Sequence, residues 1–217
     1  MIYKLNRNYN GHSLYIRDPY NPLNLPDYTL RLKYNIGTGP YISKGTATIV
    51  STSTYTTIWD VTYEDPNWDS LLGDNYGLIE ILGGNTTNVT SMRKLFNNDR
   101  DITATNLFDT SNVKDMSYMY FWNEKLSSAP IYDTSNVTSM VSMFCYCSAL
   151  NAIPQLNTQN DTKLSYMFQD CINVASGISA FYEQSKNVLY HNSTFKNCGT
   201  NTTQGKAELE LIPSGWK

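Results

Sequence analysis

A 24-residue internal repeat constrains the fold of this chain more than any other feature. The segments DTSNVKDMSYMYFWN (109–123) and DTSNVTSMVSMFCYC (133–147) start 24 residues apart, and weaker copies begin 24 residues before and after them, at Asn85 and Asn157. A degenerate fifth copy with a three-residue insertion contains Phe195. One unit of this size cannot bury its own apolar face, whereas stacked copies bury a continuous core. We therefore expect a solenoid.

Apolar columns run through the copies and predict the local structure of a unit. Val89, Met92, Leu95 and Phe96 follow an i, i+3, i+6, i+7 spacing, which predicts a helical stripe about two turns long. The Asp or Asn four residues before the valine is typical of a helix N-cap. An extended stretch with a proline follows in two of the units. The sequence thus predicts an α/β repeat, a short leucine-rich-repeat solenoid with 24-residue units, preceded by a small antiparallel β cap.

Three regions are expected along the chain. Residues 1–25 contain two X-Pro pairs, which disfavour helix, and are predicted to form an extended N-terminal arm. This arm either docks on a partner or packs on its own domain. Residues 26–76 are predicted to form a small β-rich capping domain, and residues 77–217 the leucine-rich-repeat solenoid with a C-terminal cap.

Short β-rich segments support the capping domain. Residues 28–34 alternate between apolar and polar, and segments 46–50 and 55–63 are rich in β-branched and aromatic residues. Residues 66–73 are predicted to form a short helix that leads into a strand over 77–82, the first unit of the array.

The repeated segments resemble a known family. FDTSNVKDMSYMYFWNEKLSSAP (108–130) and YDTSNVTSMVSMFCYCSALNAIP (132–154) closely resemble the BspA-like repeats, which also occur in mycoplasma lipoprotein-associated domains. The resemblance covers about residues 80–200. It departs from the family pattern where Asp161 replaces a valine and where Trp122 and Asn123 replace a polar-Cys pair. It implies a leucine-rich-repeat fold and an adhesive or surface-exposed role, and it carries over no catalytic residue.

Two further segments suggest a source and a location. IWDVTYEDPNWDSLL (58–72) and FKNCGTNTTQGKAELELIPSGWK (195–217) look similar to compact repeat proteins encoded by gut Bacteroidetes and their phages. We therefore expect a non-enzymatic virion structural or accessory protein, such as a capsid decoration, fibre or tail component, assembled in the host cytoplasm. Its partners would be other virion proteins, bound through the N-terminal arm or β cap, and a host glycan or surface protein. The alternative is a BspA-like adhesin on the bacterial cell surface.

Charge and hydropathy exclude several classes of protein. The net charge is −3 without a basic stripe, so nucleic acid is not an expected partner. No apolar stretch reaches the ~18 residues of a membrane span, and residues 1–25 lack the apolar core of a secretory signal peptide. A monomer on a larger assembly and a closed homo-oligomer both stay open.

The sequence predicts no enzyme, cofactor or metal site. The His191 and Cys198 pair lacks a third orienting residue, so a packed or solvated histidine is favoured. The cysteines occupy or adjoin one repeat column and are expected to pack as small hydrophobes; they are Cys145, Cys147, Cys171 and Cys198. A carboxylate cluster flanks a proline turn and the expected helix start, where acids are favoured; it comprises Asp60, Glu64, Asp65 and Asp69.

Aromatic residues at variable repeat positions form the candidate binding surface. Exposed aromatics on a rigid surface are typical contact residues for proteins or sugars. The alternative is that they cover the convex side or pack on neighbouring units. The candidates are Tyr118, Phe121, Trp122, Tyr146 and Tyr166.

Overall fold

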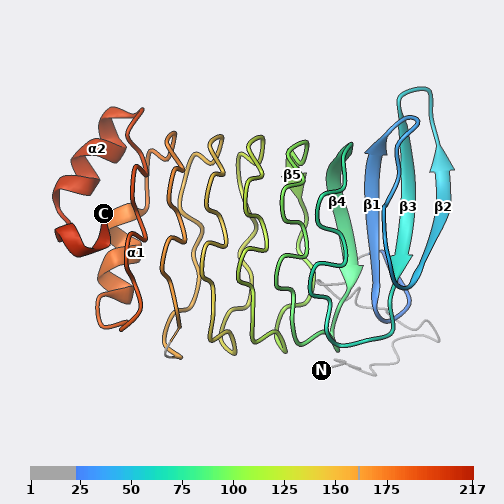
Figure 1. Ribbon diagram of the computed structural model, residues 1–217, viewed down its shortest axis with the longest axis horizontal. Coiled ribbons are helices and arrows are strands. Elements are labelled where there is room, and N and C mark those ends of the chain that lie inside the picture. The colour runs from blue at the N-terminus through green and yellow to red at the C-terminus, as the bar shows by residue number, and fades with distance from the viewer. Residues whose placement is uncertain (1–22, 161) are drawn as a thin grey trace, which may run out of the picture.

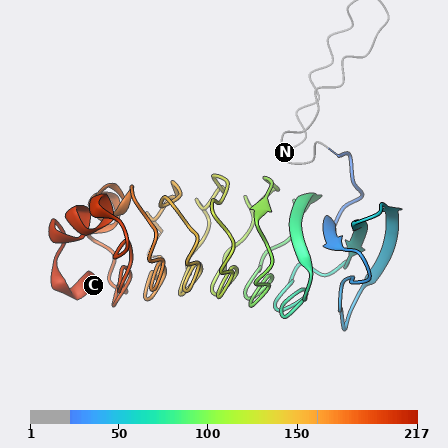
Figure 2. The same cartoon turned by 90° about the horizontal axis from the view of Figure 1, so that it is seen from above.

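The chain forms an elongated stack with a β-sheet at one end and helices at the other (Figure 1). The computed structural model describes residues 23–160 and 162–217. Of the N-terminal arm expected at 1–25, residues 1–22 lie outside the described part. In the view from above, successive units follow one another as separate, similar coils (Figure 2). We call each of these coils a rung.

A mixed five-stranded sheet, in the order β2-β3-β1-β4-β5, occupies the N-terminal end of the stack. β1 pairs antiparallel with both β3 and β4, β2 pairs antiparallel with β3, and β4 pairs parallel with β5. The sheet therefore extends from the expected capping domain, residues 26–76, into the repeat region. The division of the chain into domains stays a prediction. The strands are β1 (Thr29–Asn35), β2 (Thr46–Thr52), β3 (Thr56–Thr62), β4 (Leu78–Asn85) and β5 (Ala104–Thr105).

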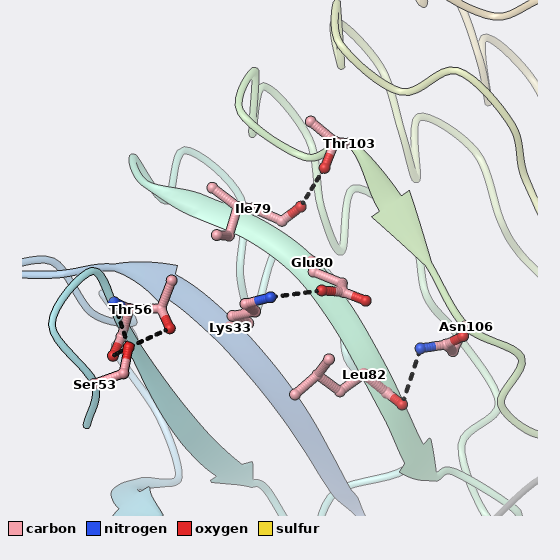
Figure 3. Close-up of polar contacts among 8 residues, drawn as sticks. All are labelled: Lys33, Ser53, Thr56, Ile79, Glu80, Leu82, Thr103 and Asn106. Atoms are coloured by element: carbon pink, nitrogen blue, oxygen red, sulfur yellow. Dashed lines mark hydrogen bonds and ion pairs between the residues drawn. The ribbon is translucent and has the colours of Figure 1, made fainter. Parts of the chain in front are cut away.

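Alternating side chains explain the central strand. Leu30, Leu32 and Tyr34 of β1 are buried, because alternate residues of a strand face the same side. The intervening residues pair with opposite charges across the sheet: Arg31 donates two hydrogen bonds to Asp60, at 2.7 and 2.8 Å. Lys33 Nζ donates a hydrogen bond to the carboxylate of Glu80 in β4 at 3.1 Å (Figure 3).

The rungs are joined by backbone hydrogen bonds between residues 23 positions apart. The N–H of Met92 donates to the carbonyl of Asp115, and that of Met116 donates to Ser139, each at 2.9 Å. Side chains add similar bonds where the stack meets the sheet, since Thr103 donates to the carbonyl of Ile79 at 3.1 Å (Figure 3). Each rung is thus hydrogen-bonded to its neighbours along the stack.

The leucine-rich-repeat prediction is wrong, because the repeated segment contains no helix. Among the described residues there are two short α-helices, α1 (Ile178–Ser185) and α2 (Thr203–Glu210), and both lie near the C-terminal end. The segment predicted as helical consists of consecutive tight turns, in which Leu95 donates to Met92 and Asn97 donates to Lys94. Lys94 has a left-handed φ of 58°, which ends any right-handed helix after a single turn.

The polar residues at the start of the repeat units join rungs instead of capping a helix. Thr110 Oγ1 donates to the carbonyl of Asp133 in the next rung at 2.9 Å. Asn112 Nδ2 donates to the carbonyl of Thr87 in the preceding rung at 2.6 Å. The polar residues of DTSN therefore form hydrogen bonds in both directions along the stack, and Val113 fills the core between them.

Residues 66–75 form one more rung, so the helix predicted over 66–73 is also wrong. Trp68 donates its N–H to Ser91 and Ser70 donates to Arg93, both at 2.9 Å, in the pattern of the later rungs. Trp68 is fully buried and occupies the position that Met92 has one rung later.

A ladder of stacked aromatic rings forms the centre of the core. Neighbouring rings lie 5.5–5.8 Å apart, centroid to centroid, and are nearly parallel. Such offset contacts add to the burial of each ring. The ladder ends against Trp216, whose ring lies 6.1 Å from that of Phe195 and belongs to η1 (Ser214–Trp216). Its members are Phe96, Tyr120, Phe144, Phe168 and Phe195.

Candidate functional site

Four of the five candidate residues form a single cluster, which we call the aromatic patch: Tyr118, Phe121, Trp122 and Tyr146. Phe121 is the hub, since its ring lies 5.7 Å from Tyr118, 6.0 Å from Trp122 and 5.7 Å from Tyr146, measured between centroids. Trp122 and Tyr146, from neighbouring rungs, are 5.5 Å apart. The stack thus gathers residues from two rungs into one surface cluster.

Tyr166 lies outside this cluster. It occupies the repeat position of Tyr118 two rungs further along and is 43% exposed. Ser142 stands at the intervening position and is buried, so no aromatic side chain connects Tyr166 to Tyr118 in that column.

The turns that carry the patch hold Trp122 and Tyr146 in an unfavourable backbone conformation. Trp122 has a φ of 65° and Tyr146 of 64°, both left-handed. The same position in other rungs holds Asn98, Asp170 and Asn197, residue types that tolerate this conformation best. For other residues with a side chain the left-handed region costs roughly 1–2 kcal/mol. Trp122 and Tyr146 are therefore exceptions to a local preference.

The indole of Trp122 is flanked along the stack. The guanidinium of Arg100, from the preceding rung, lies 4.2 Å from the ring centroid, within cation–π distance. Tyr146 follows in the next rung. Trp122 is 38% exposed and Tyr146 is 37% exposed, so the two rings present part of their surface to solvent while packing on each other.

Basic side chains surround the patch, and they were not among the sequence candidates. Arg93 and Lys94 lie 5.9 and 5.7 Å from the ring centroid of Tyr118. Arg100 also donates to Asn98 at 2.8 Å and pairs with Glu124 at 3.6 Å. Stepping back 24 residues from Tyr118 leads to Lys94, so the repeat period was a signal that could have found this neighbour. Arg93 and Arg100 lie one period before Ser117 and Glu124, which were not candidates, so the period did not point to them.

The cysteine column packs in the core, as expected from the sequence. All four cysteines are free and buried. The thiol of Cys147 donates to the carbonyl of Tyr120 at 3.1 Å, and Cys171 does the same to Phe144 at 3.0 Å. Burial raises the pKa of the Cys145 thiol to about 12, and it raises the pKa of Cys147, Cys171 and Cys198 as well. The thiolate, which is the reactive form, is therefore disfavoured.

Three of the four carboxylates in the predicted cluster make structural contacts. Asp60 binds Arg31 in the sheet. Asp65 accepts the N–H of Asn67 at 2.8 Å, and Asp69 accepts a hydrogen bond from Ser91 in the next rung. In the described residues no group of three or more His, Cys, Asp or Glu side chains is placed to hold a metal ion.

His191 packs on the C-terminal aromatic cluster. Its ring stacks on Trp216 with centroids 4.3 Å apart and planes nearly parallel. Among the described residues no hydrogen bond joins His191 to Cys198, although the two were considered as a pair from the sequence.

A cavity of about 700 Å³ lies in the later rungs. Its walls are segments 131–134 and 153–159 and one face of α1. This volume is within the usual range for ligand pockets, and Asp133 is the one charged residue among its lining residues. It contains none of the aromatic candidates.

The repeat region also identifies the family. Residues 78–181 and 125–207 each match the family described as "Mycoplasma protein of unknown function, DUF285". Together the two matches span more than half of the 217 residues. The chain belongs to this family. No curated protein and no solved structure matches the chain.

Membership of the DUF285 family agrees with the resemblance to BspA-like repeats at the level of a related repeat family. It brings no assigned activity, because the function of the family is not known. The expected phage origin has no support from this comparison. In the described residues no helix is long and apolar enough to cross a membrane.

Proposed function

We propose that this DUF285 protein is a non-catalytic recognition protein that binds another protein through the aromatic patch. The observation that carries the proposal is the placement of Trp122 and Tyr146 in left-handed turns, where other rungs have Asn or Asp. Backbone strain retained at an exposed position is typical of a functional site. Exposed Trp and Tyr side chains backed by a rigid array are the residue types that dominate protein interfaces.

The arrangement of the rings favours a protein over a glycan as the partner. A sugar would stack on an open ring face, but Trp122 lies between Arg100 and Tyr146. The patch instead offers ring edges together with the nearby cations of Arg93, Lys94 and Arg100. These groups suit a partner surface with apolar side chains and some carboxylates. Display on a bacterial cell surface, in the manner of the BspA-like adhesins, is part of this proposal.

The virion role expected from the sequence is not the function that the geometry supports best. It rests on the resemblance of segments 58–72 and 195–217 to phage-encoded proteins. In the structure these segments form the β3 region with the first rung, and the C-terminal end of the stack, respectively. Neither observation favours a virion over another location.

Binding to arrays of host cell-surface and extracellular-matrix proteins, with a glycan array in parallel, tests the proposal. The variant Trp122→Asn with Tyr146→Asn replaces the two rings by the residue that the same column uses elsewhere. We expect the wild-type chain to bind at least one protein on the array and this variant to lose at least tenfold in affinity, the effect of about 1.4 kcal/mol.

A matched control replaces Tyr55, in the β2–β3 hairpin, and Tyr190, in the last rung, by Asn; their side chains are 78% and 54% exposed. This control should bind as the wild type does. Binding to glycans alone, or equal losses in the two double variants, would contradict a protein-binding patch.

A further inference from the structure

The two ends of the stack differ in how they are closed. At the C-terminal end, α1, α2 and η1 cover the last rung, and Trp216 is 3% exposed against the aromatic ladder. At the N-terminal end the sheet stops at β2, which pairs only with β3 among the described residues. A stacked array needs a cap at each end to shield its terminal unit. Among the described residues, no further element covers the outer edge of β2.

β2 also lacks most of the features that protect natural edge strands. Its sequence, TATIVST, has no charged residue and no proline, and six of its seven residues are exposed. Ile49 and Val50 are 59% and 44% exposed. Such an edge presents a row of unpaired backbone groups to which another strand can bind.

The apolar row of the sheet continues to this edge. Trp59 of β3 lies beside the buried Leu32 of β1 on one side and beside Ile49 of β2 on the other. The inner face of the sheet therefore has an apolar side chain at its outermost strand. A strand added beyond β2 would extend the sheet and reduce the exposure of Ile49.

We propose that β2 pairs antiparallel with β2 of a second copy of this chain, which joins two stacks end to end about a two-fold axis. An uncharged strand can face its own copy without repulsion. The charges on the neighbouring strands are already neutralised in pairs, Arg31 with Asp60 and Lys33 with Glu80. A two-fold contact of this kind is closed, so the assembly ends at two copies.

The register of β2 places the two-fold axis of the proposed dimer near Thr48. β2 pairs regularly with β3 from Thr46 to Ile49, and a register shift follows between Ile49 and Ser51. Such a bulge interrupts a ladder. The regular stretch before it is therefore the part available for pairing.

Sedimentation velocity of the full chain over the micromolar range tests this proposal. We expect a species of twice 24.6 kDa. Ile49→Lys puts like charges against each other at the contact and should give a monomer with an unchanged circular dichroism spectrum. The control Tyr55→Lys adds the same charge at the hairpin tip and should remain a dimer.

Cross-linking adds a measurement that does not depend on destabilising the contact. Thr48→Cys should form a disulfide-linked dimer under a mild oxidant, whereas Thr54→Cys at the hairpin tip should not. A wild-type chain that stays monomeric, a dimer that Ile49→Lys does not dissociate, or equal cross-linking at Thr48 and Thr54 would overturn the proposal. A monomer would leave the edge to a strand from another protein.

Discussion

At the scale of single residues, one buried column changes its chemistry along the stack. Cys147, Cys171 and Cys198 occupy it in the later rungs, and polar residues occupy it in the earlier ones. Asp99 and Asn123 are both fully buried there. Among the described residues, Asp99 Oδ2 and both amide atoms of Asn123 have no hydrogen-bond partner. An unpartnered buried polar group costs about 1–3 kcal/mol, so these two positions weaken the stack.

Asn123→Cys should therefore raise the free energy of unfolding by about 1–3 kcal/mol. The substitution introduces the residue that the same column uses one rung later, where the thiol of Cys147 donates to a backbone carbonyl. Urea unfolding followed by circular dichroism measures the change. Asn187→Cys, at an exposed position, is the control and should have no effect. A lower stability for Asn123→Cys would contradict this prediction and would mean that the amide of Asn123 makes stabilising polar interactions.

Asp99 should make the stability depend on pH. The pKa of its carboxyl lies well above the ordinary value, and burial is the largest cause. The hydrogen bond from the N–H of Asn75, at 2.5 Å, lowers the pKa, whereas the nearby charge of Asp74 raises it. In the unfolded chain the carboxyl ionises near pH 3.9. As the pH rises above about 4, the unfolded state loses its proton first, so the free energy of unfolding falls.

Asp99→Asn should remove this decrease, and the free energy of unfolding should change less between about pH 4 and neutral pH than in the wild type. Urea unfolding at several pH values provides the comparison. Glu183→Gln, which alters an exposed carboxylate, should retain the wild-type dependence. An unchanged slope in Asp99→Asn would show that Asp99 ionises normally in the fold.

At the scale of elements, the tight turns replace the helix because they satisfy the backbone differently. In a helix each N–H binds the carbonyl four residues earlier. Here Met92, Lys94 and Phe96 donate to the next rung, and Leu95 and Asn97 donate within their own turns. The i, i+3, i+6, i+7 spacing of apolar residues fits both arrangements. The signal that separates them is the Asn or Asp at the second left-handed position of some rungs, such as Asn98 and Asp170.

Hydrogen bonds between rungs should contribute measurably to stability. Thr134 Oγ1 donates to the carbonyl of Asn157 at 3.0 Å and accepts its N–H at 2.6 Å. Thr134→Val keeps the shape of the side chain and removes both bonds, so we expect a loss of about 1–3 kcal/mol in the free energy of unfolding. Thr54→Val, at an exposed position in the hairpin, should change it little. An equally small change in Thr134→Val would show that water replaces these bonds.

The candidate site could be predicted in part. Trp122 and Tyr146 share a repeat column, and this alone predicts that they are neighbours in the stack. Their left-handed conformation and the position of Arg100 depend on how the turns pack, which the period does not determine. Tyr166 was placed with the others by its column, but the intervening Ser142 leaves it apart from them.

At the scale of the whole molecule, the 24-residue offset in the sequence reappears as the offset between neighbouring rungs. The β-strands near 28–34, 46–50 and 55–63 were also recognisable from the alternation of their side chains. The rung at 66–75 was missed, because its Trp and Leu residues differ from the Met and Phe of the later copies. The edge of β2 was not visible from the sequence, since strand order is a property of the folded sheet.

If each 24-residue unit is an interchangeable rung held by its neighbours, the stack should tolerate the loss of one whole unit, and a pair of deletions measures this. Removing residues 109–132 joins Phe108 to a second DTSNV segment and shortens the stack by one whole unit. Removing 111–132 takes out two residues fewer and shifts every later contact. Urea unfolding should show a cooperative transition for the first chain and none for the second. Equal behaviour of the two chains would contradict the account.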